Sequence, residues 1–144
     1  MAYQAVDEIM ARCEKDSVEF WKAVQLEDCE ENGISEEESW NQMTHMWNSM
    51  KESVAAYDPE AISRSGLVGR EGKLMDAYRE QGKPLCGDFV SKVIANALKM
   101  GCNNACMKRI VAAPTAGACG VMPAVLVTYY KEYEASEETM IQAM

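Results

Sequence analysis

Apolar side chains recur at intervals of three and four residues along most of this chain, which is the spacing that keeps them on one face of an α-helix. Residues 2–32 show this spacing first. Asp16 or Ser17 can restart the helix within them, and Gly33 ends it. Ser35 and the three glutamates that follow it form a capping box, so a second helical segment is predicted to begin there.

The stretch after the capping box has the most regular pattern in the chain. Its apolar stripe consists of Trp40, Met43, Trp47, Met50 and Val54. Asp58 and Pro59 close it, because a proline disfavours helical backbone in the residue before it. We therefore predict that residues 1–60 form an acidic helical hairpin. Three tryptophans are expected to make its core or a docking face: Trp21, Trp40 and Trp47.

From residue 61 onward, glycines divide the chain into shorter helices. Gly66, Gly69 and Gly72 lie three residues apart. The predicted helices after them cover Lys73–Gln81, Asp88–Gly101, Asn103 to Val111 or Ala112, and Val121–Glu134. No stretch alternates apolar and polar residues between turns, so no strand is needed. The prediction is an all-α, multi-helix bundle-like domain in which the acidic hairpin is followed by glycine-punctuated helices.

The last residues carry one more helix-start signal. Ser136, Glu137, Glu138 and Thr139 begin a helix with only five residues after them, and a helix that short is marginal in water. We therefore expect Met144 to be an interior residue of a longer protein. Residues 1–144 are then a single helical domain at its N-terminal end, with a glycine-rich-turn segment at 61–144.

Composition narrows the class of protein. The 144 residues are 48% hydrophobic and 26% charged, which fits one compact domain. The longest uncharged apolar stretch, Ile110–Tyr130, contains two prolines and two glycines that break a membrane-spanning helix. The N-terminus lacks the pattern of a secretory signal. We expect a cytoplasmic protein without a membrane partner, whose six cysteines are reduced thiols.

The net charge of −9 is unevenly distributed. Residues 1–60 hold 15 acidic and 4 basic side chains, whereas residues 61–130 hold 4 acidic and 9 basic ones. Neither part offers the basic face that nucleic-acid binding requires, so no nucleic-acid partner is expected. The positive middle segment favours a small anionic ligand. The alternative is that the acidic helices solvate the surface and the local balance has no ligand.

Two turns place a hydroxyl and a glycine at a predicted helix start, and they are Ser65–Gly66 and Thr115–Ala116–Gly117. Such turns present backbone N–H donors, a hydroxyl and the positive end of a helix dipole, which together suit an anionic group. Neither is a phosphate-binding loop, because no strand precedes the glycines and no Gly-Lys-Ser/Thr ending follows them. The alternative is that both are only tight connections between helices.

A local metal site is a further candidate. Cys102 and Cys106 are four residues apart, and Cys119 follows the next turn. Zinc sites usually combine two close cysteine pairs or add histidine, whereas this chain has one histidine, His45. We expect that histidine at the surface or in the core and not as a base. The alternative for the thiols is that they are small buried groups in a methionine-rich helical core.

Four motifs follow one another in a familiar order and spacing, and they are Ser65–Gly72, Gly82–Asp88, Asn103–Met107 and Ala112–Pro123. Together they resemble the alpha chain of iron-sulfur-dependent L-serine dehydratase, also called L-serine ammonia-lyase. The Pro-Thr-Ala-Gly turn that begins at Pro114 is the most specific part. The acidic opening helices also look like those of that chain, and the resemblance covers essentially all 144 residues.

The resemblance implies a lyase that removes water from L-serine and yields pyruvate and ammonia. The family uses a [4Fe-4S] cluster, with one iron not held by cysteine, as a Lewis acid on the serine hydroxyl. Its cluster cysteines lie in a Gly-Gly-Cys motif and a later paired-cysteine motif, and this sequence contains neither. We therefore expect a fragment with no metal ligand of its own and no activity alone. Its partners are the remainder of the alpha chain and the beta chain, while homo-oligomerisation and the general base stay open.

By the same resemblance, the substrate carboxylate is bound by Ser65, Gly66, Thr115, Ala116 and Gly117. The chain departs from the family at four positions, with Val68 in place of Thr, Arg70 in place of Gly, and Cys86 and Ala118 each in place of Ser. These departures bear on which hydroxy amino acid is preferred. A competing interpretation is a helical protein-interaction module that docks through the acidic, tryptophan-bearing hairpin.

Overall fold

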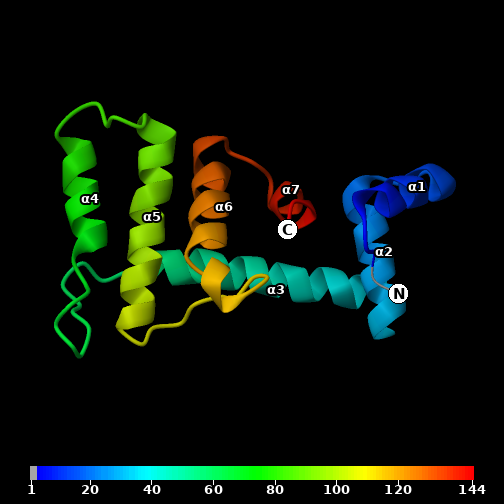
Figure 1. The fold of residues 1–144 in the computed structure, drawn as a ribbon, viewed down its shortest axis with the longest axis horizontal. Coiled ribbons are helices and arrows are strands. Elements are labelled where there is room, and N and C mark those ends of the chain that lie inside the picture. The colour runs from blue at the N-terminus through cyan, green and yellow to red at the C-terminus, as the bar shows by residue number, and fades with distance from the viewer. Residues whose placement is uncertain (1–2) are drawn as a thin grey trace. The chain divides into compact units, whose positions relative to one another are not determined.

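A computed structural model describes residues 3–144. Their ordered elements are all helical and include no strand, so the all-α prediction is confirmed (Figure 1). The helices are α1 (Val6–Asp16), α2 (Phe20–Asn32), α3 (Glu36–Ala55), α4 (Glu71–Glu80), α5 (Asp88–Ala105), α6 (Val121–Glu132) and α7 (Glu137–Gln142), with a 3₁₀ turn at Ala116–Ala118.

Contacts divide the described residues into two compact units. The N-terminal unit comprises the residues up to His45 together with Glu137–Met144, and the central unit comprises Met46–Ser136. Helix α3 therefore contributes its first half to one unit and its second half to the other. The boundary between the two units thus lies within α3, whereas the sequence pattern predicts a change from the acidic hairpin to the next segment after residue 60.

The first two helices end where the sequence predicts a break, at Ser17 and Gly33, whereas α1 begins at Val6 and α2 at Phe20, later than predicted. Ser17 adopts the left-handed conformation after α1 with φ of 54°, and Gly33 does the same after α2 with φ of 64°. The Ser35 hydroxyl oxygen accepts a hydrogen bond from the Glu38 N–H at 3.1 Å, so Ser35 caps α3 as predicted. Local sequence thus sets the breaks that separate these three helices.

The N-terminal unit is held by charged contacts at its surface and by a small core. Helices α1 and α2 pack together, and the Arg12 guanidinium joins them by pairing with Asp16 and by donating to Glu30 at 2.8 Å. Helix α7 buries Met140 and Ile141. This burial gives a six-residue helix the packing without which it would be marginal.

In the central unit, α4, α5 and α6 run side by side in alternating directions with α5 in the middle (Figure 1). The second half of α3 supplies Trp47 and Met50, both completely buried. The Trp47 ring meets the Tyr130 ring of α6 edge-on, with 5.4 Å between the ring centroids. Large side chains therefore fill this core.

The helix predicted from Asn103 to Val111 or Ala112 is wrong. Asn103 lies in the last turn of α5, which continues to Ala105, and Met107 has φ of 60°. The physical reason is a distant partner, because the buried Asn103 amide donates to the Ser53 carbonyl at 2.7 Å. The other helices predicted after residue 61 are confirmed, with ends shifted by four residues or fewer.

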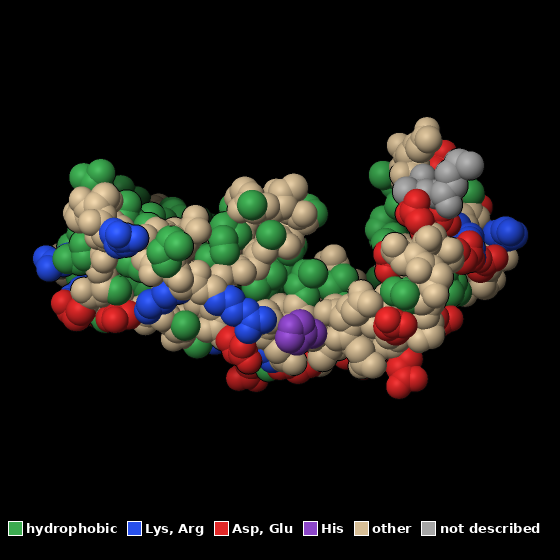
Figure 2. Space-filling view, turned by 90° about the horizontal axis from the view of Figure 1, so that it is seen from below, with side chains coloured by type: hydrophobic (Ala, Val, Ile, Leu, Met, Phe, Trp, Pro, Cys, Tyr) green, Lys and Arg blue, Asp and Glu red, His purple; other side chains and the backbone are tan. Residues whose placement is uncertain are grey.

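The visible surfaces of the two units differ in their charged side chains. Figure 2 shows mostly acidic charged side chains over the N-terminal unit, and both basic and acidic ones together with hydrophobic side chains over the central unit. Within residues 3–144, no helix is both long enough and apolar enough to cross a membrane.

Candidate functional site

The Ser65–Gly66 turn is a small loop whose two ends bond to each other. The Ser63 N–H donates to the Val68 carbonyl at 2.7 Å, and the Val68 N–H donates to the Ser63 hydroxyl at 3.1 Å. At the tip, the Gly66 N–H donates to the Ser63 carbonyl at 2.8 Å, and Gly66 has φ of 75°, which a glycine adopts without steric cost. Ser65 and Gly66 are exposed, and the Ser65 hydroxyl lies 3.1 Å from the hydroxyl of buried Ser63.

A half-buried carboxylate, that of Glu71, ties this turn to α5. A side chain at Gly69 would place its Cβ 2.3 Å from the Ala61 carbonyl oxygen, so the backbone closes tightly there. The Glu71 carboxylate accepts the Gly69 N–H at 2.8 Å and the Cys102 thiol at 3.2 Å. The bond from Gly69 is the main reason that the pKa of Glu71 is lowered. Burial raises the pKa of the Cys102 thiol, so the thiol stays protonated and donates.

Tyr57 supports the same turn from the segment after α3. Its hydroxyl accepts the Lys73 N–H at 2.9 Å and donates to the Gly69 carbonyl at 3.5 Å. Burial raises the pKa of Tyr57, which keeps the phenol neutral. The turn therefore rests on Tyr57 and Glu71, which are not among the residues singled out in the sequence.

The Thr115–Gly117 turn presents a hydroxyl and the first amides of a 3₁₀ turn. Thr115 is extended, with φ of −131°, and its side chain makes no capping bond. The first bond of the turn runs from the Ala118 N–H to the Thr115 carbonyl at 3.1 Å. The amides of Ala116 and Gly117 precede that bond, which is where helical N–H groups lack an acceptor within the helix. Thr115, Ala116 and Gly117 are exposed.

The two turns approach α5 from its two sides. Next to the first turn, on the side of α4, Glu71 accepts a hydrogen bond from Cys102 of α5. The second turn leads into Gly120, which precedes α6 and lies against Ala97 of α5. Ala97 and Cys102 are five residues apart, roughly 7.5 Å along the helix axis. Among the described residues, no hydrogen bond joins one turn to the other. The structure thus leaves the five predicted residues on two separate turns, and it is Glu71 and Gly120, next to these turns, that contact α5.

Positive charge beside the first turn comes from two exposed arginines. Arg64 and Arg70 flank the turn, and neither forms an ion pair with a residue that the structure describes. Lys108 and Arg109 instead donate to oxygens within residues 49–56. Arg64 and Arg70 are therefore the cations available to an anionic ligand at this turn, and the sequence had drawn attention only to Arg70.

The six cysteines carry free thiols at scattered positions. In the part of the chain that the structure describes, no three side chains of His, Cys, Asp or Glu come together in a group that could hold a metal ion. The Cys102 thiol, one of the candidate ligands, is bonded to Glu71. His45 is exposed on α3.

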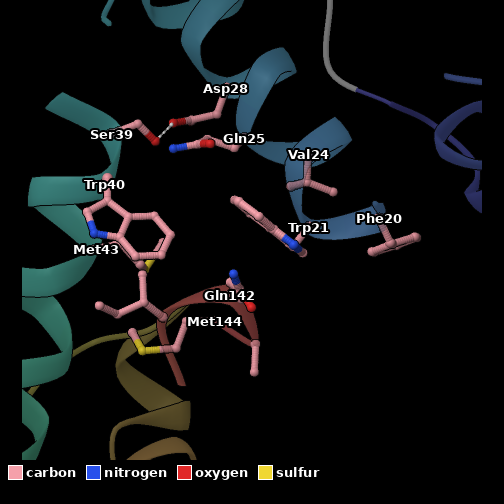
Figure 3. A pocket seen from close by; sticks show the side chains of 12 residues that line it. Phe20, Trp21, Val24, Gln25, Asp28, Ser39, Trp40, Met43, Gln142 and Met144 are labelled. Atoms are coloured by element: carbon pink, nitrogen blue, oxygen red, sulfur yellow. Dashed lines mark hydrogen bonds between the residues drawn. The ribbon is translucent and has the colours of Figure 1, made fainter. Parts of the chain in front are cut away.

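The N-terminal unit holds a separate pocket of about 460 Å³ (Figure 3). Helices α2, α3 and α7 line it. The Trp21 and Trp40 rings meet edge-on in its wall with centroids 6.0 Å apart, and the Ser39 hydroxyl donates to Asp28 at 3.4 Å. Mostly apolar walls with a few polar groups are typical of binding sites. None of the five predicted carboxylate-binding residues lines this pocket, and it is the feature that best suits the competing interaction-module interpretation.

Comparison with known proteins gives a consistent set of relatives. The family described as "Serine dehydratase alpha chain" matches residues 14–144. The chain is 29% identical over 134 residues to the L-serine dehydratase alpha chain of Peptoniphilus asaccharolyticus. This match covers 92% of this chain and 46% of the relative. It is 31% identical over 108 residues to a probable L-serine dehydratase alpha chain of Bacillus subtilis (strain 168). This second match covers 75% of this chain and 36% of that relative. The chain thus spans less than half the length of these relatives, and no solved structure matches it.

Proposed function

Because this chain belongs to the serine dehydratase alpha chain family, we propose that it forms part of an L-serine dehydratase that converts L-serine to pyruvate and ammonia. The support is the family match together with two relatives that carry that enzyme's name. Since the chain spans less than half of each relative, the proposed enzyme also includes the remaining alpha-chain residues and a beta chain. In this proposal the chain alone is inactive and the enzyme is cytoplasmic.

The part proposed for this chain is to hold the carboxylate of L-serine. The observation that carries this role is the exposed Thr115 hydroxyl beside the amides of Ala116 and Gly117, which precede the first bond of their turn. A carboxylate accepts such donors strongly, because charge-assisted hydrogen bonds are stronger than neutral ones. Ser65 adds its exposed hydroxyl from the other turn. Gly66 contributes through its left-handed backbone, since its own amide is bonded to Ser63.

The charge of the central unit supports an anionic substrate. Residues 61–130 carry nine basic and four acidic side chains. Arg64 and Arg70 are exposed next to the Ser65 turn. Their long-range field favours the carboxylate over neutral analogues and helps to bring it to the surface of this unit.

We assign the iron-sulfur cofactor of the proposed enzyme to the residues that this chain does not cover. In the complete enzyme a [4Fe-4S] cluster would supply Lewis-acid chemistry. The described residues do not fit such a cluster. No three side chains of His, Cys, Asp or Glu among them come together, and the Cys102 thiol donates a hydrogen bond to Glu71. No catalytic step is therefore routed through a metal on this chain.

The experiment that tests the carboxylate role replaces Thr115 in an assembly of this chain with the remaining alpha-chain residues and the beta chain, prepared anaerobically with iron and sulfide. Thr115→Val removes a donor to a charged group, worth about 1.5–3 kcal/mol, so the KM for L-serine should rise about tenfold or more. Because the bond is present before and during the reaction, kcat should change less than KM.

The matched control is Thr44→Val, which removes a hydroxyl that is bonded within α3. This variant should keep the parental KM. If Thr115→Val also keeps it, Thr115 is not part of the substrate site.

A further inference from the structure

Two helices of the central unit carry apolar stripes that the described chain leaves partly exposed. On α5 the stripe is Val90, Ile94 and Leu98, and on α6 it is Val121, Val125 and Tyr129. Each stripe repeats every four residues, and its members are 36% to 58% exposed. Since α5 and α6 pack side by side, we call the two stripes together the open face.

The geometry of the helices turns both stripes away from α3. On α5, Asn103 faces α3, because its amide donates to the Ser53 carbonyl. Ile94 is nine residues earlier, about two and a half turns, and so lies on the opposite side of the helix. On α6, Tyr130 faces α3 through its contact with Trp47, and Val121 is again nine residues earlier. The open face is therefore the side of the layer opposite α3.

The two stripes lie on neighbouring helices. Helices α5 and α6 pack side by side, and both stripes face away from α3. At one end of the α6 stripe, the Tyr133 ring lies 4.7 Å from the Tyr129 ring, measured between centroids. The open face is thus an extended apolar surface, of the kind that marks an interaction site.

The composition of α6 indicates what kind of contact this surface makes. Nine of its 12 residues are apolar or aromatic, and they lie on all sides of the helix. A helix that is apolar all round belongs inside a protein core. Permanent interfaces are more apolar than transient ones, and they resemble a protein core cut in half. The missing partner is therefore a permanent one.

We propose that the open face packs against the part of the alpha chain that this chain does not contain. The relatives supply the reason, because the matched region makes up only 46% and 36% of their lengths and the rest belongs to the same polypeptide. The residues beyond the match thus present an apolar surface to α5 and α6 and complete one core. This inference rests on family membership and not on the carboxylate role of Thr115.

The test co-expresses this chain with the residues of the Peptoniphilus asaccharolyticus alpha chain that lie outside the match, carrying an affinity tag. The matching residues of that same alpha chain serve as the positive control. We expect this chain to co-purify in equal amounts, and we expect the double variant Ile94→Lys/Leu98→Lys to lose at least nine-tenths of that capture. Val6→Lys, at an apolar position on α1 that is 63% exposed, should leave capture unchanged.

A folding readout keeps the test interpretable. The double variant changes residues that are 39% and 36% exposed, so it should lose some thermal stability but keep the helical circular dichroism of the parent at the temperature of the capture experiment. Failure of this chain to bind while the positive control binds would overturn the proposal. So would capture that survives the double variant, or an open face that instead holds a second copy of the chain or the beta chain. None of these outcomes depends on serine turnover, so the experiment tests the open face independently of the proposed function.

Discussion

Trp40 and Trp47 lie on the same helix about two turns apart, and yet they belong to different units. Trp40 is half-buried and meets Trp21 beside a pocket. Trp47 is completely buried and meets Tyr130, which is far away in sequence. One apolar stripe thus serves two kinds of packing, and the helical period alone does not tell them apart.

The polar contacts differ less than the packing does. Both units carry ion pairs at their surface, such as Arg12 with Glu30 in the N-terminal unit and Lys92 with Asp88 in the central unit. The central unit also has a hydrogen bond from the buried Asn103 amide to the Ser53 carbonyl. Water and salt weaken exposed ion pairs far more than a buried hydrogen bond of this kind.

Truncating the two tryptophans should give the largest difference between the units. Trp47→Ala removes a fully buried ring and should lower the free energy of unfolding by about 3–5 kcal/mol. Trp40→Ala removes a half-exposed ring, and its cost should be about 1 kcal/mol. Chemical denaturation of both variants measures the difference. Equal losses would mean that the two units bury these rings to the same extent.

A smaller effect is expected from the buried amide of the central unit. Asn103→Ala leaves the Ser53 carbonyl without its donor and should cost about 1–3 kcal/mol. Its sequence neighbour gives a matched control, because Asn104 is exposed and Asn104→Ala should change stability by about 0.5 kcal/mol or less. A similar cost for both variants would contradict the role assigned to the Asn103 amide.

The smallest expected effects on stability come from replacing Glu71 and Glu30, whose contributions should depend on pH and salt. The pKa of Glu71 is lowered mainly by the Gly69 N–H, and that of Glu30 mainly by its hydrogen bond to Arg12. Because a lowered pKa stabilises the fold above the ordinary carboxyl pKa, each Glu→Gln variant should be less stable than the parent at neutral pH. The deficit should disappear as pH falls through the lowered pKa and the parent carboxylate becomes protonated.

Salt distinguishes the two cases. The Glu30 contact is an exposed ion pair, so 1 M salt should shrink the deficit of Glu30→Gln. The Glu71 contact is to a backbone amide and a thiol, so the deficit of Glu71→Gln should persist. Melting temperatures at several pH values and two salt concentrations provide the measurement. If both deficits respond equally to salt, the comparison of the two units fails for these residues.

Sequence predicted the features that depend on near neighbours. The cap at Ser35 and the ends at Ser17 and Gly33 are decided within a few residues, and each is present. The extension of α5 through Asn103 was missed, because the partner of its amide lies 50 residues away. The pairing of Trp47 with Tyr130 was missed for the same reason. Contacts between distant segments follow from packing, and the local pattern does not encode them.

In the candidate site, too, the features set by near neighbours could be predicted and the contacts between distant segments could not. The two turns could be found because glycine and hydroxyl residues mark them locally. The support of the first turn could not, since Glu71 and Cys102 meet only when α4 packs on α5. An acidic residue in the first turn of a helix is common, and nothing in the sequence pairs it with Cys102, which was considered instead as a metal ligand.

The most direct test of the central claim is a double-mutant cycle on the assembled enzyme. Ser65→Ala, Thr115→Val and the combined variant are compared by kcat/KM for L-serine. If both turns hold one carboxylate, the two losses are not additive, and the coupling energy is about 0.5 kcal/mol or more. Losses that simply add, or a variant pair without any loss, would contradict the claim that the two turns share a single substrate group.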